Sequence, residues 1–152
     1  MTGPEQHLRQ HFFDLRLPPA AAEWLLGVWN AIQVLDDAAD NDPIDRKDLH
    51  RAIYDLFVDL PSNPFFVHNA VALLPALSLM VLKWKASDDA ERAECADARS
   101  FVWRAGYYDV VLAAVAVAHG RDEALAVARG VLSLYGETLD EYLKEFPPCQ
   151  IR

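Results

Sequence analysis

Five aspartates stand close together in the stretch QVLDDAADNDPID, from Gln33 to Asp45. On a helix, successive residues turn by about 100°, so Asp36 and Asp40 lie one turn apart on one face, where two carboxylates can share a cation. Mg²⁺ is held in proteins by one or two carboxylates, keeps several of its waters and bridges to phosphates. The stretch therefore makes Asp36, Asp37 and Asp40 candidate metal ligands.

A second group of carboxylates would complete such a site, and three further aspartates are candidates for it. Asp55 and Asp59 are one turn apart on the next predicted helix, and Asp109 lies at the border of an apolar helical face. A cation held by these groups would clamp a phosphate and activate a bound water molecule.

The same acids also have a structural explanation. Near Asp40 a helix is expected to end, and the helix dipole disfavours carboxylates there by roughly 0.3–1 kcal/mol each. Asp36 points along the apolar stripe of its helix, and Arg104 falls among apolar residues of a later one. A buried arginine needs a carboxylate, so an ion pair between Asp36 and Arg104 would explain both residues without a metal. Asp37 and Asp40 would then form an acidic edge that a metal or a basic partner could meet.

Composition limits the class of protein. The 152 residues are 53% hydrophobic, which fits one folded domain, and the formal net charge of −9 disfavours nucleic-acid binding. Cys95 and Cys149 form no disulfide framework, and no secretory signal opens the chain, so we expect a cytoplasmic protein. The longest apolar run, Val71 to Leu82, is shorter than the about 20 residues of a membrane span, so we expect no membrane.

Helical spacing of apolar residues, with proline and small polar residues between the segments, predicts a single all-α domain over residues 1–152. We expect a bundle or irregular globule of five to six helices. The predicted ranges are Glu5–Asp14, Pro18–Asp40, Pro43–Leu60 with Asp42 or Asp45 as its cap, Pro64–Ala86 with Asn63 as its cap and a kink at Pro75, Ser87–Gly120 and Asp122–Phe146. The predicted apolar face of the second helix consists of Trp24, Leu25, Val28, Trp29, Ile32 and Leu35. That of the third consists of Leu49, Ala52, Ile53, Leu56, Phe57 and Leu60. The faces of these helices predict that Trp29, Ile32, Leu56, Phe101 and Leu112 are buried.

Three resemblances concern function. The motif DDAAD resembles the first aspartate-rich motif of class I terpenoid and prenyl-chain synthases, which implies Mg²⁺ ligands at Asp36, Asp37 and Asp40. Together with YYDVV it is similar to the layout of all-α nucleotide pyrophosphohydrolases, which hold Mg²⁺ with acidic pairs on two helices. The succession of PSNPFF, LKW and SFVWRAGYYDVV resembles small all-helical bacteriophage proteins of unassigned function. That last resemblance implies a phage or prophage origin and a role in host takeover, anti-defence or particle assembly.

Two functions follow from these observations. The first is a non-catalytic interaction protein, with a protein partner or a second copy of itself, that acts through an acidic helical surface. The second is a small Mg²⁺-dependent phosphohydrolase or diphosphate-binding enzyme that uses the DDAAD cluster. We prefer the first because no complete catalytic set can be assembled from the sequence.

Overall fold

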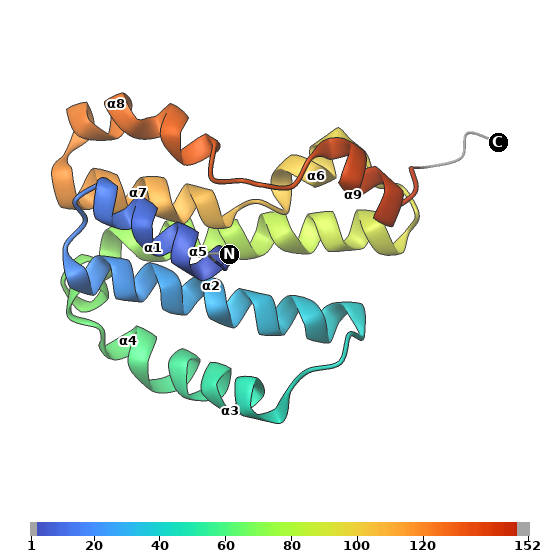
Figure 1. The fold of residues 1–152 in the computed structure, drawn as a ribbon, viewed down its shortest axis with the longest axis horizontal. Helices are drawn as coiled ribbons and strands as arrows, with labels where there is room; N and C mark the ends of the chain where they lie inside the picture. The colour runs from blue at the N-terminus through green and yellow to red at the C-terminus, as the bar shows by residue number, and fades with distance from the viewer. Residues whose placement is uncertain (1–2, 149–152) are drawn as a thin grey trace. The chain divides into compact units, whose positions relative to one another are not determined.

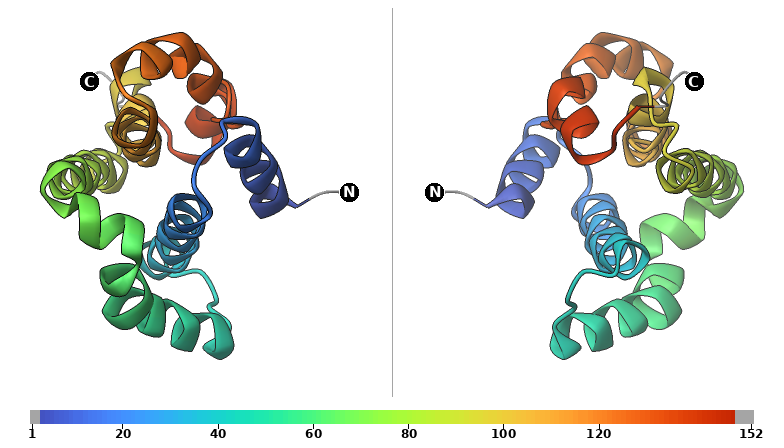
Figure 2. Two further views of the ribbon diagram at one scale, coloured as in Figure 1. Left: turned by 90° about the vertical axis from the view of Figure 1, so that its left-hand side faces the viewer. Right: turned by 90° about the vertical axis from the view of Figure 1, so that its right-hand side faces the viewer.

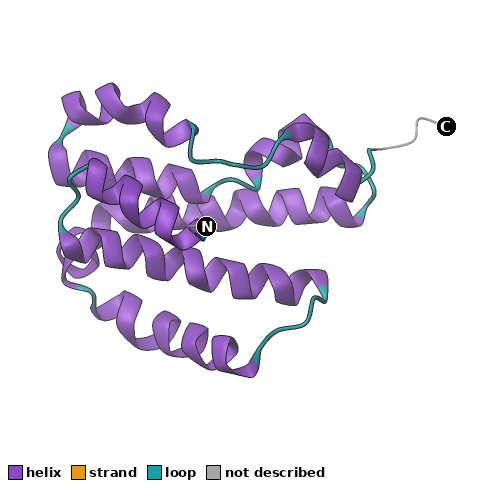
Figure 3. Ribbon diagram, viewed as in Figure 1, coloured by secondary structure: helices purple, strands orange, loops and turns teal. Residues whose placement is uncertain are grey.

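The computed structural model describes residues 3–148. Cys149, the second of the two cysteines considered above, lies outside the described residues. The part of the chain that is described contains helices and no strand, which confirms the predicted all-α class (Figure 1, Figure 3). Contacts divide the chain into two compact units, residues 1–70 and 71–152. The prediction of a single domain stays a prediction.

Unit 1 is organised around its longest helix. It contains α1 (Pro4–Asp14), α2 (Pro19–Asp40), α3 (Arg46–Tyr54), the π-helix η1 (Asp55–Asp59) and α4 (Leu60–Ser62). Helix α2 contacts α1, α3, η1 and α4, and it supplies the most buried residues of the unit (Figure 2). Trp24, Leu25 and Val28 are buried as their spacing predicts, whereas Trp29 and Ile32 are only half-buried. The first two-thirds of α2 therefore supply the largest share of the core of unit 1.

Asn63 joins the start of α2 to the start of the fifth helix. Its amide nitrogen donates to the Ala20 carbonyl at 3.0 Å, and its amide oxygen accepts from the backbone nitrogens of Phe65 and Phe66 at 2.9 and 3.2 Å. Trp24 lies beside this junction and stacks on Phe66, with ring centroids 5.4 Å apart and an interplanar angle of 12°. The predicted capping role of Asn63 is confirmed, and the same side chain fixes α2 as well.

Helix α3 turns its polar side toward α2. Its buried residue is Ala52, while Leu56 is 39% exposed and Phe57 is 80% exposed. The predicted burial of Leu56 is therefore wrong. The other apolar residues of that predicted face, Leu49 and Ile53, are also exposed.

The π-helix η1 explains part of this difference. The prediction rests on regular α-helical spacing through Leu60, but residues 55–59 form the wider π turn, which displaces the residues that follow from their α-helical positions. Pro61 lies two residues beyond the end of η1, and in a regular helix its ring would clash with the carbonyl of Phe57. The widened turn accommodates a proline that the sequence pattern placed just beyond the helix.

Helix α5 (Pro64–Arg92) begins in unit 1 and continues through unit 2. Its non-helical residue is Asn69, with φ −124° and ψ 17°, rather than the predicted kink site Pro75. The Asn69 side chain donates to the Phe65 carbonyl, one turn earlier in α5, at 2.8 Å.

By length and composition alone, α5 could cross a membrane, a criterion that core helices of soluble proteins also meet. Of its most apolar 18-residue window, 11% is buried. The continuous helix is longer than the run from Val71 to Leu82 on which the expectation of no membrane span rested. That expectation stays a prediction.

Unit 2 contains the rest of α5 and four shorter helices. These are α6 (Ala98–Trp103), α7 (Tyr107–His119), α8 (Arg121–Leu132) and α9 (Leu139–Glu145). Helices α7 and α8 lie side by side, and α6 contacts α9 (Figure 1). Helix α7 supplies the largest number of buried residues, with Val110, Val111 and Val115 fully enclosed, while Phe101 on α6 and Leu112 on α7 are half-buried.

The predicted helix from Ser87 to Gly120 is wrong. Ser87 is not a helix start but a buried residue inside α5, which ends at Arg92. Glu94 then takes the left-handed conformation, with φ 54°, and Asp97 caps α6 by accepting hydrogen bonds from the backbone nitrogens of Arg99 and Ser100. A further turn over residues 104–106 separates α6 from α7.

Gly106 sits in that turn because it lies against α5. A Cβ atom at this position would come within 3.0 Å of Met80 Cα and 3.3 Å of the Met80 carbonyl oxygen. Since both neighbours are backbone atoms, a larger residue would force the two helices apart. The close approach explains why the turn ends on glycine.

The predicted last helix from Asp122 to Phe146 is also divided. Helix α8 ends at Leu132, and α9 starts after Thr138, whose hydroxyl accepts from the Glu141 backbone nitrogen while the Glu141 carboxylate accepts from the Thr138 nitrogen. This reciprocal cap is readable as T-x-x-E in the sequence. The two divided segments give the described residues more helices than the five to six predicted.

Three helix ends use a left-handed residue with a side chain. Arg16 follows α1 at φ 53°, Asn41 follows α2 at φ 59°, and Glu94 follows α5 at φ 54°. Each next residue donates its backbone N–H back into the helix it leaves, as Asp42 does to the Asp37 carbonyl at 2.8 Å. The predicted end of the second helix near Asp40 is confirmed.

A buried leucine and an exposed leucine of unit 1 should differ in the cost of replacement by alanine. Leu25 is fully buried, so Leu25→Ala should reduce the free energy of unfolding by about 2–5 kcal/mol. Leu56 is exposed, so Leu56→Ala should cost roughly 0.5 kcal/mol or less. Urea unfolding of the two variants measures both values. Equal costs would show that Leu56 in η1 is not exposed as described.

Candidate functional site

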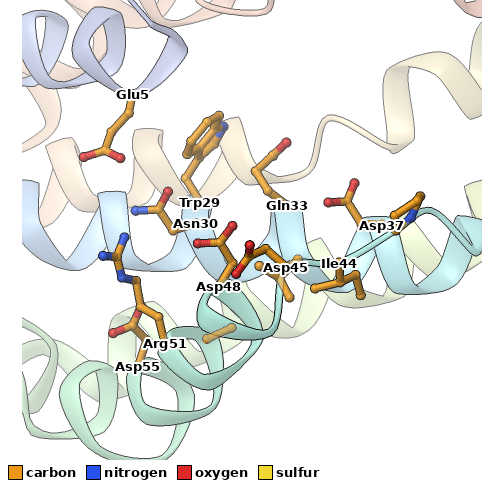
Figure 4. A pocket seen from close by; sticks show the side chains of 13 residues that line it. Glu5, Trp29, Asn30, Gln33, Asp37, Ile44, Asp45, Asp48, Arg51 and Asp55 are labelled. Carbon is orange, nitrogen blue, oxygen red and sulfur yellow. The ribbon is translucent and has the colours of Figure 1, made fainter.

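A cleft in unit 1 is the candidate functional site. It has a volume of about 480 Å³ and lies between α2 and the segment from Pro43 to Asp55, with one residue from α1 (Figure 4). Its lining residues are Glu5, Trp29, Asn30, Gln33, Val34, Asp37, Pro43, Ile44, Asp45, Asp48, Arg51, Ala52 and Asp55.

Carboxylates dominate the charge of this cleft. Glu5, Asp37, Asp45, Asp48 and Asp55 line it, against a single guanidinium, that of Arg51. Figure 4 shows these acids spread along the cleft, with Arg51 near Asp55 at one end. The arrangement presents many hydrogen-bond acceptors and a strong negative potential.

Helical spacing places the acids of one wall. Asp48, Arg51, Ala52 and Asp55 are spaced as neighbours on one face of a helix, and this is the face that α3 and η1 turn toward α2. Asp45 precedes this helix and accepts a hydrogen bond from the Lys47 backbone nitrogen at 2.7 Å. Of the two predicted caps of this helix, Asp42 and Asp45, the structure confirms Asp45. The wall is therefore held by the helix and by its N-terminal cap.

Asp55 is electrostatically unusual. Burial and the neighbouring Asp59 carboxylate raise the pKa of Asp55 above its ordinary value, and Arg51 opposes them with a smaller effect. The predicted pair Asp55 and Asp59 is thus present as two interacting acids, with Asp55 on the cleft wall.

The predicted metal ligands are only partly brought together. Asp37 and Asp55 line the cleft, whereas Asp36 and Asp40 are half-buried on α2 and do not line it. In unit 2, Asp109 accepts from the Lys83 ammonium at 2.6 Å. Among the described residues, no three His, Cys, Asp or Glu side chains are placed to hold a metal ion. The predicted metal role of these residues stays a prediction.

Arg104 belongs to a buried polar cluster of unit 2. Its guanidinium lies 3.7 Å from Glu91 Oε1 and 3.9 Å from Glu137 Oε2, and it stands 5.1 and 5.2 Å from the ring centroids of Tyr142 and Phe146. These acids are its neighbours within the unit. The predicted pair of Arg104 with Asp36 would join residues of different units and stays a prediction.

The hydroxyl groups of this cluster are close to one another. Tyr142 Oη lies 2.7 Å from Ser100 Oγ and 2.9 Å from Glu91 Oε1, and Ser87 Oγ donates to the Ser100 carbonyl at 2.8 Å. Burial is the main reason that the pKa of Tyr142 is raised. The hydroxyl therefore stays protonated and serves as a hydrogen-bond donor at neutral pH.

Reasoning from sequence did not identify several of these residues. Glu5, Asp48 and Arg51 look like ordinary solvent-facing charges of amphipathic helices, and no signal marks them as cleft residues. In unit 2 the caps at Asp97 and Thr138 are readable, and they would have indicated the helix breaks that bring Ser100 and Tyr142 together. The two sites therefore differ in how far a sequence reveals them.

Comparison with known proteins found no matching protein family, no matching curated protein and no matching solved structure.

The pKa of Asp55 predicts a pH-dependent effect of its removal. Because the pKa of Asp55 is raised in the folded state, the folded protein binds the Asp55 proton more tightly than the unfolded chain does. Protonation of Asp55 therefore stabilises the fold below the unfolded pKa, and this stabilisation is lost as pH rises through the folded pKa. Asp55→Asn should therefore have a higher urea midpoint than the wild type at pH 7 and no such advantage at pH 3. Asp55→Glu, which keeps an ionisable carboxyl, is the control. Identical midpoints of Asp55→Asn and wild type at pH 7 would contradict the prediction.

Proposed function

We propose that the protein is a non-catalytic interaction protein that binds a basic segment of a protein partner in the acidic cleft of unit 1. The observation that carries the proposal is the lining of that cleft, where five carboxylates face one guanidinium. It agrees with the net charge of −9, which favours basic partners.

The side chains of the cleft suit lysine and arginine. Carboxylates only accept hydrogen bonds, and lysine and arginine only donate them, so each contact would be charge-assisted. The half-buried Trp29 adds an aromatic surface over which a cation can bind. A concave site with charge of one sign also speeds the encounter with a partner of the opposite sign.

The same lining supports binding more than nucleophilic catalysis. The residues of the cleft include no serine, cysteine, histidine or lysine that could act as a nucleophile or as a base near neutral pH. The resemblance to small helical bacteriophage proteins suggests the setting, in which the partner is a host or phage protein of the cytoplasm. Host takeover, anti-defence or particle assembly would each use such a contact.

A lysine-rich peptide tests the cleft. We expect a fluorescently labelled decalysine peptide to bind the full chain at low salt, and Asp37→Asn/Asp48→Asn to weaken binding roughly two- to thirty-fold, because two exposed charge pairs are lost. The matched control is Asp122→Asn/Asp140→Asn, which changes net charge equally on α8 and α9. Fluorescence anisotropy gives both affinities. Equal weakening by the two double variants would show that only net charge matters, and the cleft would lose its role.

The Mg²⁺-dependent alternative gives a different result. If Asp36 and Asp40 hold a cation, the wild type should bind Mg²⁺ or Mn²⁺ in a calorimetric titration, and Asp36→Asn/Asp40→Asn should abolish binding while circular dichroism stays helical. The interaction protein proposed here needs no cation for peptide binding. Peptide binding that appears only with Mg²⁺ would favour the alternative.

A further inference from the structure

We propose that unit 2 carries a docking groove for a tyrosine-bearing helix, which α9 fills within its own chain and which the α9 of a second copy can fill in its place. The groove, called the Tyr142 groove below, consists of Ser87 and Glu91 on α5, Ser100 and Phe101 on α6, and Arg104 directly after α6.

The groove recognises tyrosine through both its hydroxyl and its ring. The Tyr142 hydroxyl lies between Ser100 Oγ and Glu91 Oε1, at 2.7 and 2.9 Å. The ring lies 5.4 Å from that of Phe101, and the Arg104 guanidinium is 5.1 Å from its centroid. Phenylalanine could fill the space but could not donate the hydrogen bond, so the groove is specific for tyrosine.

Its polar groups are present without any contribution from α9. Ser87 and Ser100 are 1% and 6% exposed, and Ser87 Oγ lies 3.1 Å from Glu91 Oε1 and 2.8 Å from the Ser100 carbonyl. Asp97 fixes Ser100 through the cap of α6. Because these contacts join α5 and α6 directly, the acceptors for a tyrosine hydroxyl stay in position when α9 leaves.

Helix α9 is attached as a separable segment. It has seven residues, of which Tyr142 is the buried one, and its neighbouring helix is α6. Phe146, one turn further on, lies next to Tyr142, with ring centroids 5.3 Å apart and an interplanar angle of 45°, and its own centroid is 5.2 Å from the Arg104 guanidinium. The segment therefore binds as a short helix with an aromatic pair one turn apart, the spacing that helix-in-groove recognition uses.

The chain before α9 allows exchange. Tyr135 stays with the body of the unit, since its ring lies 5.1 Å from Phe101 and 5.6 Å from Tyr108. Gly136 and Thr138 beyond it are exposed and non-helical, while Glu137 between them accepts from the Tyr135 hydroxyl at 3.1 Å. Rotation at Gly136, with release of the Glu137 contacts, can carry α9 outward. Exchange of an identical element between copies is a low-cost route to a dimer. A tethered helix has an effective concentration of about millimolar, so the groove is closed within each chain at lower protein concentrations.

A peptide copy of α9 tests the groove in the full chain. A fluorescein-labelled peptide of residues 136–148 should bind the Tyr142→Ala protein at least about ten-fold more tightly than the wild type, because the tethered competitor no longer fills the groove. A peptide that carries Tyr142→Phe should bind that protein about ten-fold more weakly, since the hydrogen bond to a carboxylate is lost. Asp37→Asn/Asp48→Asn, in unit 1, should leave peptide binding unchanged. Equal affinity of wild type and Tyr142→Ala for the peptide would overturn the groove.

Two further measurements complete the test. If circular dichroism shows that Tyr142→Ala loses its helices, Tyr142→Phe in the full chain replaces it, and an affinity no higher than that of the wild type overturns the groove. Sedimentation equilibrium near millimolar concentration should show a reversible dimer for the wild type and a monomer for the Tyr142 variant that keeps its helices. A wild type that stays monomeric there would overturn the exchange between copies.

Discussion

The side chain of Asn63 sets the geometry on which unit 1 depends. One amide group bonds the first turn of α2 and the first turn of α5, and the stacked rings of Trp24 and Phe66 close the junction beside it. The chain from Asn41 to Ser62 must therefore leave the far end of α2 and return to its beginning. Because α3 and η1 have to run back along α2, a face of α3 and a face of α2 enclose a space, and that space is the acidic cleft.

The two units handle their charged groups in opposite ways. In unit 1 carboxylates gather in an open cleft with one arginine, where water screens their repulsion and a basic ligand would relieve it. In unit 2 the acids next to Arg104 are largely enclosed, and each hydroxyl near Glu91 is oriented by a neighbour. An open acidic surface suits reversible recognition of many basic sequences. An enclosed polar cluster suits the selection of one side chain.

The sequence predicted the helical class, the ends of α2 and the cap at Asn63 because each depends on residues adjacent in the chain. It extended one helix through Glu94 because that turn uses glutamate where a pattern would require glycine. It predicted that the apolar face of α3 and η1 is buried, because periodicity identifies an apolar face but does not show whether another element covers it. Phe57 in η1, which is 80% exposed, shows that this face is not covered. Of the residues that line the cleft, the sequence marked Asp37 and Asp55 as candidate ligands and Asp45 as a helix cap. It did not predict the cleft itself, since the positions of Glu5 and Asp48 depend on packing between helices.

The left-handed residues Arg16 and Glu94 bear on the evolution of this fold's stability. A residue with a Cβ atom in the left-handed region costs roughly 1–2 kcal/mol, a penalty that glycine avoids. The fold keeps both residues, although neither lines the acidic cleft nor belongs to the Tyr142 groove. Such retained strain is what mutation produces when selection requires only that stability stays above a threshold. The chain therefore has reserve capacity for stabilisation at its helix ends, and substitutions there could offset the destabilising changes through which a binding surface acquires new partners.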